Sequence, residues 1–236
     1  MSIWARISEL LTTVPANALS SVIEAVRTVL SGDPQLRRRV AFSIAMIALS
    51  AKMAKADGIV TQDEVRAFQQ IFVVPAEQTR NVARLFDLAK QDVAGFEAYA
   101  ERLAGLCGNG RPNCPVLEDI LDGLFHIATA DGLVHEREVG FLRRISEIFE
   151  IREERFEAIL SRHAVTGEAD PWRVLGLELG APFEEVRAQY RRMAAENHPD
   201  RLIARGVPEE FLAIANRRLA AINAAYETIE RSRRPA

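Results

Sequence analysis

The stretch FEEVRAQYRRMAAENHPD, residues 183–200, decides the local fold of the C-terminal third of the chain. Val186, Tyr190 and Met193 recur at steps of four and three, which is the spacing of one face of an α-helix. Proline disfavours helical geometry in the residue before it, so we expect this helix to end close to His198. The sequence therefore predicts a helix followed by a stiffened loop from which His198 points outward.

Helices are also predicted on both sides of this segment. Asp170 and Pro171 suit the start of a short helix, and Gly176 can end it because glycine adopts positive φ at little cost. A long helix is expected from about Pro208, with apolar positions at Ala215, Leu219, Ile222, Tyr226 and Ile229. This spacing matches a helix packed antiparallel against the one before it. The region is thus predicted to be a small helical hairpin with a charged loop at its tip.

Four short motifs in this region resemble the J domain of DnaJ-type proteins. In chain order they are Asp170-Pro171-Trp172 with Val174-Leu175-Gly176-Leu177, Tyr190-Arg191-Arg192, His198-Pro199-Asp200, and Ile222-Asn223 with Ala225-Tyr226-Glu227. The resemblance keeps the order of the family's motifs, and it implies that residues 170–236 form a J domain.

The resemblance also implies a partner, a DnaK-type chaperone ATPase. Basic side chains of the predicted helix would dock on an acidic surface of that ATPase. The His-Pro-Asp loop would reach the junction of its nucleotide and peptide domains and promote ATP hydrolysis. Asp200 can make a charge-assisted bond to a guanidinium, and Pro199 limits the entropy lost on docking. The partner-binding residues implied are Arg187, Arg191, Arg192, His198, Pro199, Asp200 and Arg201.

Two residues depart from the family's pattern at the end of the predicted helix. Glu196 adds a negative charge where the family often has a basic residue, and Asn197 replaces a usual aromatic. The sequence also shows neither the Gly/Phe-rich linker nor the cysteine-rich zinc module of full DnaJ proteins. We therefore expect no general client-binding apparatus, and the sequence does not name a client.

The middle of the chain contains an internal repeat. Ala54-Lys55-Ala56-Asp57-Gly58-Ile59-Val60 recurs as Ala128-Thr129-Ala130-Asp131-Gly132-Leu133-Val134, and a glutamate follows each copy at the same spacing. In each copy the glycine can end one helix, and the glutamate can cap the next one. A two-fold helical domain over residues 32–164 follows from this repeat.

The repeated carboxylates leave two interpretations open. Asp57, Glu64, Asp131 and Glu138 can close and cap helix turns, which we expect to be their main role. Alternatively they converge on a divalent cation, although their spacing is not that of an EF-hand loop. The repeated Ala-x-Ala-Asp-Gly turn resembles the TerB-like helical domain of tellurite-resistance proteins. That resemblance implies an acidic, metal-associated interaction domain, and no cofactor is expected to be required.

Taken together, a TerB-like domain and a C-terminal J domain resemble the DjlA family of bacterial membrane-associated co-chaperones. The predicted organisation is an amphipathic helical segment at 1–31, the TerB-like domain at 32–164, a linker at 165–169 and the J domain at 170–236. Members of that family commonly begin with a membrane span, which we do not expect here. The longest apolar run, residues 41–51, is about half of the length that a bilayer requires, so it is predicted to be a buried helix.

The first 30 residues carry an apolar stripe that can serve three purposes. It can lie on a membrane surface, contact a partner helix or join the protein's own core. Its arginines are balanced by glutamates, which argues against strong attraction to anionic lipid. We expect this segment to pack on the TerB-like domain or on a second copy in a homodimer. The protein would then be cytoplasmic, with peripheral contact at the inner face of the membrane as the alternative.

Composition narrows the class of function. The apolar content of 48% in 236 residues supports two cores, and a net charge of −3 gives no overall attraction to nucleic acid. Cys107 and Cys114 are spaced too widely for a zinc-binding pair and are expected to be unpaired thiols. No catalytic triad, phosphate-binding glycine loop or histidine-rich cluster stands out, so we do not expect an enzyme. A regulatory co-chaperone is the leading interpretation. The alternative is a metal- or envelope-stress-sensing interaction protein with an accessory J domain.

Overall fold

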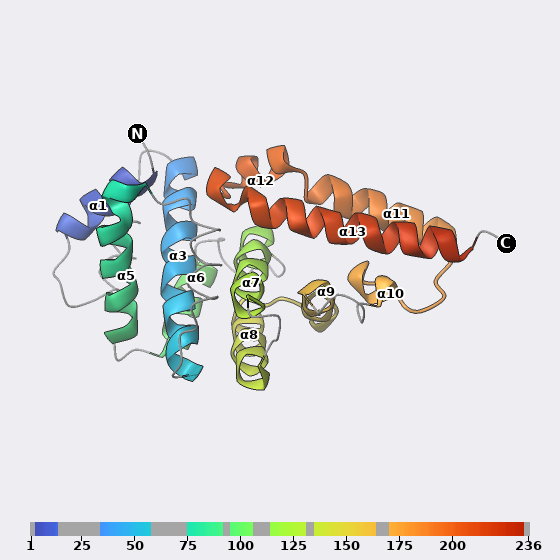
Figure 1. Cartoon of the computed structure of the whole chain (residues 1–236), viewed down its shortest axis with the longest axis horizontal. Helices are drawn as coiled ribbons and strands as arrows, with labels where there is room; N and C mark the ends of the chain where they lie inside the picture. Colours follow the sequence, from blue (N-terminus) through green and yellow to red (C-terminus); the bar gives the residue numbers. More distant parts are fainter. Residues whose placement is uncertain are drawn as a thin grey trace.

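The computed structural model describes residues 3–13, 34–57, 75–91, 95–105, 114–130, 135–163 and 170–233. These residues form helices joined by turns, which confirms the all-α class (Figure 1). The helices are α1 (Ile3–Thr13), α3 (Pro34–Asp57), α5 (Thr79–Gln91), α6 (Phe96–Ala104), α7 (Pro115–Ala128), α8 (Glu136–Ile148), α9 (Glu153–His163), α10 (Pro171–Val174), α11 (Phe183–Glu196), α12 (Pro199–Arg205) and α13 (Leu212–Ser232). Two short 3-10 turns precede α5 and α13, at Ala76–Gln78 and Glu209–Phe211.

Helix α3 is the centre of the larger core. Every residue from Val40 to Ala54 is buried, and α1, α5, α6, α7 and α8 pack around the helix. The apolar run at residues 41–51 is therefore a buried helix, as its length indicated. Within the described ranges, no helix combines the length and the apolar character that a bilayer span requires.

Helix α1 packs against this core. Trp4 and Ile7 are 3% and 1% exposed and belong to the same apolar cluster as α3. The side-chain amide of Asn81 on α5 donates a hydrogen bond to Ser8 Oγ at 2.7 Å. The described part of the N-terminal stripe thus joins the protein's own core, and residues 14–33 lie outside the described residues.

The second copy of the repeated turn shows the cap that the sequence suggested. Glu138 is 2% exposed, and its carboxylate accepts a hydrogen bond from the backbone N–H of His135 at 2.9 Å. This bond secures the first turn of α8. Glu64, Asp131 and the side chain of Asp57 lie outside the described residues, so the metal interpretation stays a prediction.

The expectation of two unpaired thiols is wrong. Cys114, the residue before α7, is disulfide-bonded. Spacing alone argued against a zinc pair, but it did not exclude a disulfide at Cys114. The chain's other cysteine, Cys107, lies outside the described residues.

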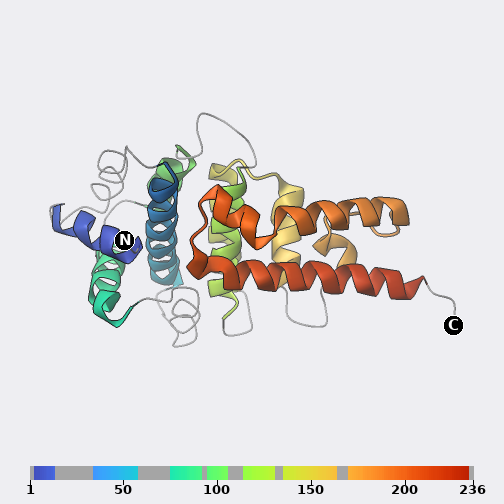
Figure 2. The same ribbon diagram turned by 90° about the horizontal axis from the view of Figure 1, so that it is seen from above.

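The C-terminal hairpin has a small core of its own. Helices α11 and α13 run antiparallel in Figure 2, and with α10 they bury Val174, Leu175, Val186, Met193, Ile222, Ala225 and Ile229. The rings of Tyr190 and Tyr226 stack at 4.2 Å, and the Tyr190 hydroxyl lies 3.1 Å from Asn223 Oδ1. Asp170 caps α10 by accepting from Trp172 N–H at 3.0 Å, and Gly176 ends the turn at φ 66°. The Asp170 cap, the Gly176 stop and the burial of Val186, Met193, Ile222 and Ile229 are as the sequence predicts, whereas Ala215 packs in the core around α3.

The connection between the two hairpin helices differs from the prediction. Instead of a short link after Arg201, the chain forms α12, which starts at Pro199 and ends at Gly206 with φ 93°. Its apolar residues and those that follow pack into the core built around α3 rather than into the hairpin: Leu202, Val207, Phe211, Ile214 and Ala215. Phe211 meets Phe42 of α3 edge to face at 4.5 Å. Helix α12 and the turn that follows it are thereby docked on the TerB-like domain.

Candidate partner-binding loop and its buried base

The His-Pro-Asp loop combines a fixed backbone with exposed side chains. His198 is the N-cap of α12, and its Nδ1 accepts a hydrogen bond from the backbone N–H of Asp200 at 3.3 Å. Pro199 occupies the first helical position, where its ring favours the helix and no N–H is needed. The side chains of His198 and Asp200 are 59% and 88% exposed. Both can therefore reach a partner while the backbone that carries them is held by the cap.

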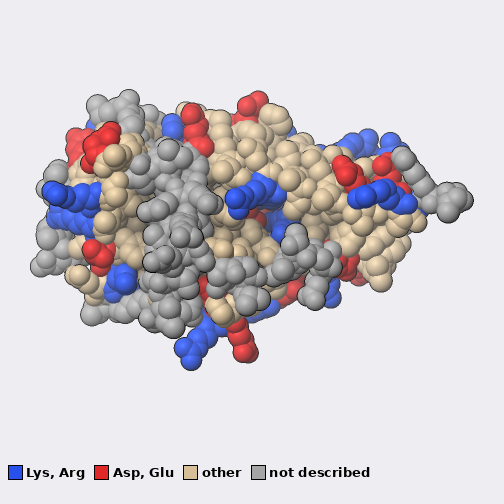
Figure 3. Space-filling model, in the orientation of Figure 1, with Lys and Arg blue, Asp and Glu red and all other residues tan. Residues whose placement is uncertain are grey.

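The predicted arginines lie on the exposed side of α11 and α12. Arg187, Arg191, Arg192 and Arg201 are all exposed, and Arg187 lies 3.5 Å from Glu184 one turn earlier. Arg192 and Arg201 line a cleft between the two domains, whereas Arg187 and Arg191 are not among the cleft-lining residues. The structure therefore brings only two of the four arginines to this cleft. In Figure 3, acidic and basic side chains lie next to each other at the free end of the hairpin.

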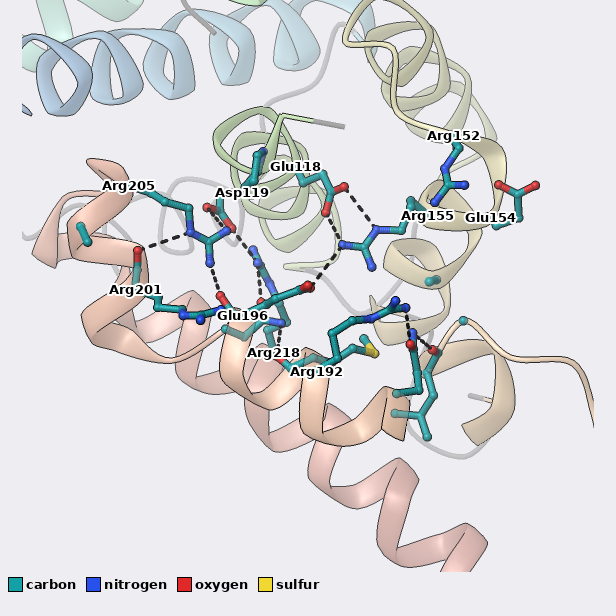
Figure 4. Close-up of a pocket in the computed structure, with 18 residues that line it drawn as sticks. Glu118, Asp119, Arg152, Glu154, Arg155, Arg192, Glu196, Arg201, Arg205 and Arg218 are labelled. Carbon is teal, nitrogen blue, oxygen red and sulfur yellow. Dashed lines mark hydrogen bonds and ion pairs between the residues drawn. The ribbon is translucent and has the colours of Figure 1, made fainter. Parts of the chain in front are cut away.

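The cleft has a volume of about 670 Å³ and two walls of different origin. Helices α7 and α9 form one wall, and α10 to α13 form the other. Six arginines and four carboxylates line it, and several pair across the domain boundary (Figure 4). Arg155 on α9 binds Glu118 on α7 through both Nε and Nη2, at 3.2 and 2.8 Å. The same guanidinium lies 3.9 Å from the carboxylate of Glu196 on α11.

Beside the cleft, Arg218 joins the two domains through a buried ionic network. The arginine projects from α13, and its side chain is 9% exposed. Nη1 donates to Asp119 Oδ1 at 2.6 Å, and Nε donates to Asp122 Oδ2 at 3.0 Å. Both carboxylates lie on α7, whereas Asp122 also accepts from Arg162 on α9 at 3.0 Å. Because these groups are out of water, losing one partner would leave an uncompensated buried charge.

The two carboxylates respond to this environment in opposite directions. Burial raises the pKa of Asp119, and the nearby guanidinium groups of Arg218 and Arg205 only partly offset it. Burial would also raise the pKa of Asp122, but Arg218, His163 and Arg162 together hold it well below its usual range. The same network raises the pKa of Arg218, since the attraction of both carboxylates exceeds the penalty of burial. Asp122 is therefore the firmly ionised anchor of the network.

Asn197 connects this network to the His-Pro-Asp loop. It directly precedes His198 and is 8% exposed. Its Nδ2 donates to the carbonyl of Met193 at 2.7 Å, and its Oδ1 accepts from Arg218 Nη1 at 2.8 Å. The residue before the loop is thus bonded to the guanidinium that also binds the TerB-like domain.

Comparisons with known proteins agree with the two halves of this architecture. Residues 43–161 match the family model described as tellurite resistance protein TerB. The chain is 30% identical to the co-chaperone protein DjlA of Photobacterium profundum over 222 residues, which cover 83% of this chain and 79% of that relative. The chain belongs to the DjlA co-chaperone family. The resemblance to the TerB domain and the resemblance to the DjlA family are thereby confirmed.

Other DjlA relatives give the same result. The chain is 30% identical to DjlA of Coxiella burnetii over 202 residues, covering 77% of this chain and 73% of that protein. It is 27% identical to DjlA of Vibrio vulnificus over 237 residues, with coverage of 86% and 82%. No solved structure matches the chain.

The two departures noted at the end of α11 acquire a structural reason in this DjlA-family chain. Glu196 faces Arg155 of the TerB-like domain, and Asn197 binds Arg218. The amide of Asn197 donates to Met193 and accepts from Arg218, a combination that the ring of a phenylalanine could not provide. Both residues that differ from the usual J-domain pattern therefore serve the contact between domains.

Sequence reasoning missed the central members of the network, Asp119, Asp122 and Arg218. One signal was present, because the two aspartates stand one turn apart in an otherwise largely apolar helix and so share a face with core residues. Such carboxylates need a buried cation as a partner. The identity of that cation could not be inferred, since Arg218 is 99 residues from Asp119 in the chain.

The metal site predicted from the repeated carboxylates stays a prediction. Among the described residues, no group of three or more His, Cys, Asp or Glu side chains is placed to hold a metal ion. Of the four candidate carboxylates, only Glu138 has a described side chain, and it caps α8.

Proposed function

We propose that this DjlA-family protein stimulates ATP hydrolysis by a DnaK-type chaperone through its His-Pro-Asp loop. The TerB-like domain would provide localisation or the choice of client. The observation that supports the proposal is the combination at residues 198–200 of a capped backbone and two exposed polar side chains. This chain would act as a regulator, since hydrolysis takes place in the partner, and we assign it no catalytic residue and no required cofactor.

Each group in the loop has a distinct task in this proposal. The carboxylate of Asp200 would bind a guanidinium of the ATPase in a charge-assisted hydrogen bond. Pro199 restricts φ, which lowers the entropy that the loop loses on docking. The exposed arginines of α11, among them Arg187 and Arg191, would steer the protein towards an acidic surface and mainly raise the association rate.

Single-turnover ATP hydrolysis by a DnaK-type chaperone tests the proposal. His198→Gln and Asp200→Asn are expected to abolish stimulation by the full chain. Arg191→Glu should raise the concentration needed for half-maximal stimulation, because it reverses a charge on the docking face. Arg84→Glu is the matched control, since it makes the same charge change at an exposed position of α5. Full stimulation by the Asp200→Asn protein would sink the proposal.

We further propose a cytoplasmic protein whose contact with membranes, if any, is peripheral. Support comes from α1, because Trp4 and Ile7 are buried in the core and are turned away from any lipid surface. Flotation of the full chain with vesicles that contain anionic lipid is the test. We expect the protein to stay at the bottom of the gradient, and co-flotation would show that the N-terminal segment anchors it.

A further inference from the structure

We propose that the TerB-like domain sets the orientation of the His-Pro-Asp loop through Arg218. Arg218, Asn197 and Asp119 are then positioning residues for the stimulation of the partner ATPase. This inference rests on the proposed function above, and it adds a role for the TerB-like domain in the chemistry of the J domain itself.

The side chain of Asn197 is held in one orientation by two hydrogen bonds. Its amide is bonded at both ends, to Met193 within α11 and to Arg218 on α13. The side chain can therefore not rotate without breaking a buried hydrogen bond. Because His198 is the next residue, the direction in which the chain leaves α11 is set by these two bonds.

Arg218 binds Asn197 through a group of fixed geometry. A guanidinium is a planar fork with five N–H donors in fixed directions. Here Nε and Nη2 serve Asp122 of the TerB-like domain, and Nη1 serves both Asp119 of that domain and Asn197 of the hairpin. A shift of α7 relative to the hairpin would move the guanidinium and with it Asn197. The network thus couples the position of one domain to the loop of the other.

A second anchor lies on the other side of the loop. Leu202 is 1% exposed and packs in the core around α3, and Val207 follows it there. The exposed segment 198–201 therefore lies between two anchors, Asn197 before it and Leu202 after it, and both are tied to the TerB-like domain. The loop is short enough that fixing its two ends fixes its direction.

Positioning and docking make different predictions for a stimulation curve. The arginines of α11 govern how tightly the partner binds, so changing them alters the half-maximal concentration. Misorientation of the loop leaves that face intact and instead lowers the stimulation reached at saturation. A role limited to stability would change neither quantity in protein that is folded at the assay temperature.

The test uses Asn197→Ala, Arg218→Lys and the double variant in the full chain. Lysine keeps the charge that Asp122 needs, but a single ammonium cannot also reach Asn197. We expect each single variant to lower maximal stimulation by about tenfold, the change that corresponds to the loss of one charge-assisted hydrogen bond. The half-maximal concentration should stay within about twofold. The double variant should be no worse than Arg218→Lys, because that substitution already removes the bond to Asn197.

Arg217→Lys is the matched control. Arg217 neighbours Arg218 on α13 and reaches His126 of the TerB-like domain at 3.2 Å, but it has no contact with the loop. Its substitution should leave maximal stimulation unchanged. Asp119→Asn is a further variant, which weakens the hold on Arg218 from the other domain and should lower maximal stimulation as well.

The outcomes separate the two proposals. If Asn197→Ala and Arg218→Lys are folded and stimulate like the wild type while His198→Gln is inactive, the positioning role is wrong and the proposed function stands. If the wild type itself gives no stimulation, the proposed function fails and the inference falls with it. Should Arg218→Lys not fold, Asn197→Ala decides alone, because it removes no charge.

Discussion

Asn197 and His198 are neighbours in the chain but lie in opposite environments. Asn197 is buried and bonded to Arg218, whereas the side chain of His198 is 59% exposed at the start of α12. Buried polar groups depend on their partners because water cannot replace them. Exposed groups keep their hydration and are available to another molecule. Within one turn of chain, the base of the loop serves stability and orientation, and the tip is free for recognition.

The difference follows from what each side chain contacts. Asn197 binds Arg218, which also binds the two buried carboxylates of α7, whereas the side chains of His198 and Asp200 are exposed. Without α7 beside it, Arg218 would lack the two carboxylates that neutralise its charge in the interior. The TerB-like domain thus changes the environment of the residue that precedes the His-Pro-Asp loop.

The largest effect on stability is expected from Arg218→Met. This variant tests whether the buried ionic network beside Asn197 stabilises the fold. Removing this guanidinium leaves Asp119 and Asp122 buried without their shared partner, so the free energy of unfolding should fall by about 3–5 kcal/mol. Urea denaturation of the full chain measures the loss. Arg217→Met, at the exposed position beside it, should change stability by about 0.5 kcal/mol or less. Equal midpoints for the two variants would show that the network contributes nothing.

Two adjacent apolar residues of α12, one buried and one exposed, test the same difference between buried and exposed positions. Leu202 is 1% exposed and Ile203 is 38% exposed. Leu202→Ala should cost about 2–4 kcal/mol through lost burial and the cavity left behind, whereas Ile203→Ala should cost well under half of that. Thermal unfolding followed by circular dichroism compares them. A similar small loss for both would mean that α12 does not dock on α3 in solution.

A pH titration probes the boundary between the domains. Burial, followed by repulsion from Arg217, lowers the pKa of His126 from 6.5 to about 4. Below pH 6.5 His126 is therefore protonated in the unfolded chain, whereas in the folded protein it stays neutral until about pH 4. Stability is complete above pH 6.5 and falls as the pH decreases through this window, by about 1 kcal/mol at pH 5 after allowance for solvent screening.

His126→Gln is the control for that titration, because it removes the titrating group and keeps a polar side chain. The variant should lose less stability between pH 7 and pH 5 than the wild type does. A second fall, below about pH 4, is expected in both proteins, because the unfolded chain then takes up a proton at Asp122 whereas the folded protein keeps this carboxylate ionised, its pKa lying well below the usual value. Identical curves above pH 5 would contradict the assignment to His126.

The smallest effect on stability is predicted for the tip. Asp200→Asn and His198→Gln should each change the free energy of unfolding by about 0.5 kcal/mol or less, because both side chains are exposed. Urea denaturation of the proteins used for the ATPase assay measures this change in the free energy of unfolding. A loss of 2 kcal/mol or more, on the order of a buried contact, would mean that the tip is part of the packed structure and would erase the contrast with Asn197.

The sequence by itself determined the local structure of this protein. Helical spacing, the Asp170 cap, Gly176 and the proline after His198 are signals that act within a few residues, and the structure confirms the elements they predict. The order of the J-domain motifs and the repeated turn pointed to the DjlA family for the same reason, since short motifs survive as linear patterns. The long apolar run at residues 41–51 likewise predicted the buried centre of the core.

Only the tertiary structure decided how the two domains meet. Arg218 finds Asp122 and Asp119 across 96 and 99 residues of chain, and no local spacing encodes which cation will neutralise which buried carboxylate. The helix α12 was missed because its apolar side is satisfied by α3 rather than by the hairpin that contains it. Glu196 and Asn197 looked like departures from a pattern when taken alone. In the structure Glu196 lies 3.9 Å from Arg155 of α9, and Asn197 binds the arginine that α7 holds, because the energy of a buried polar group depends on its neighbours in space.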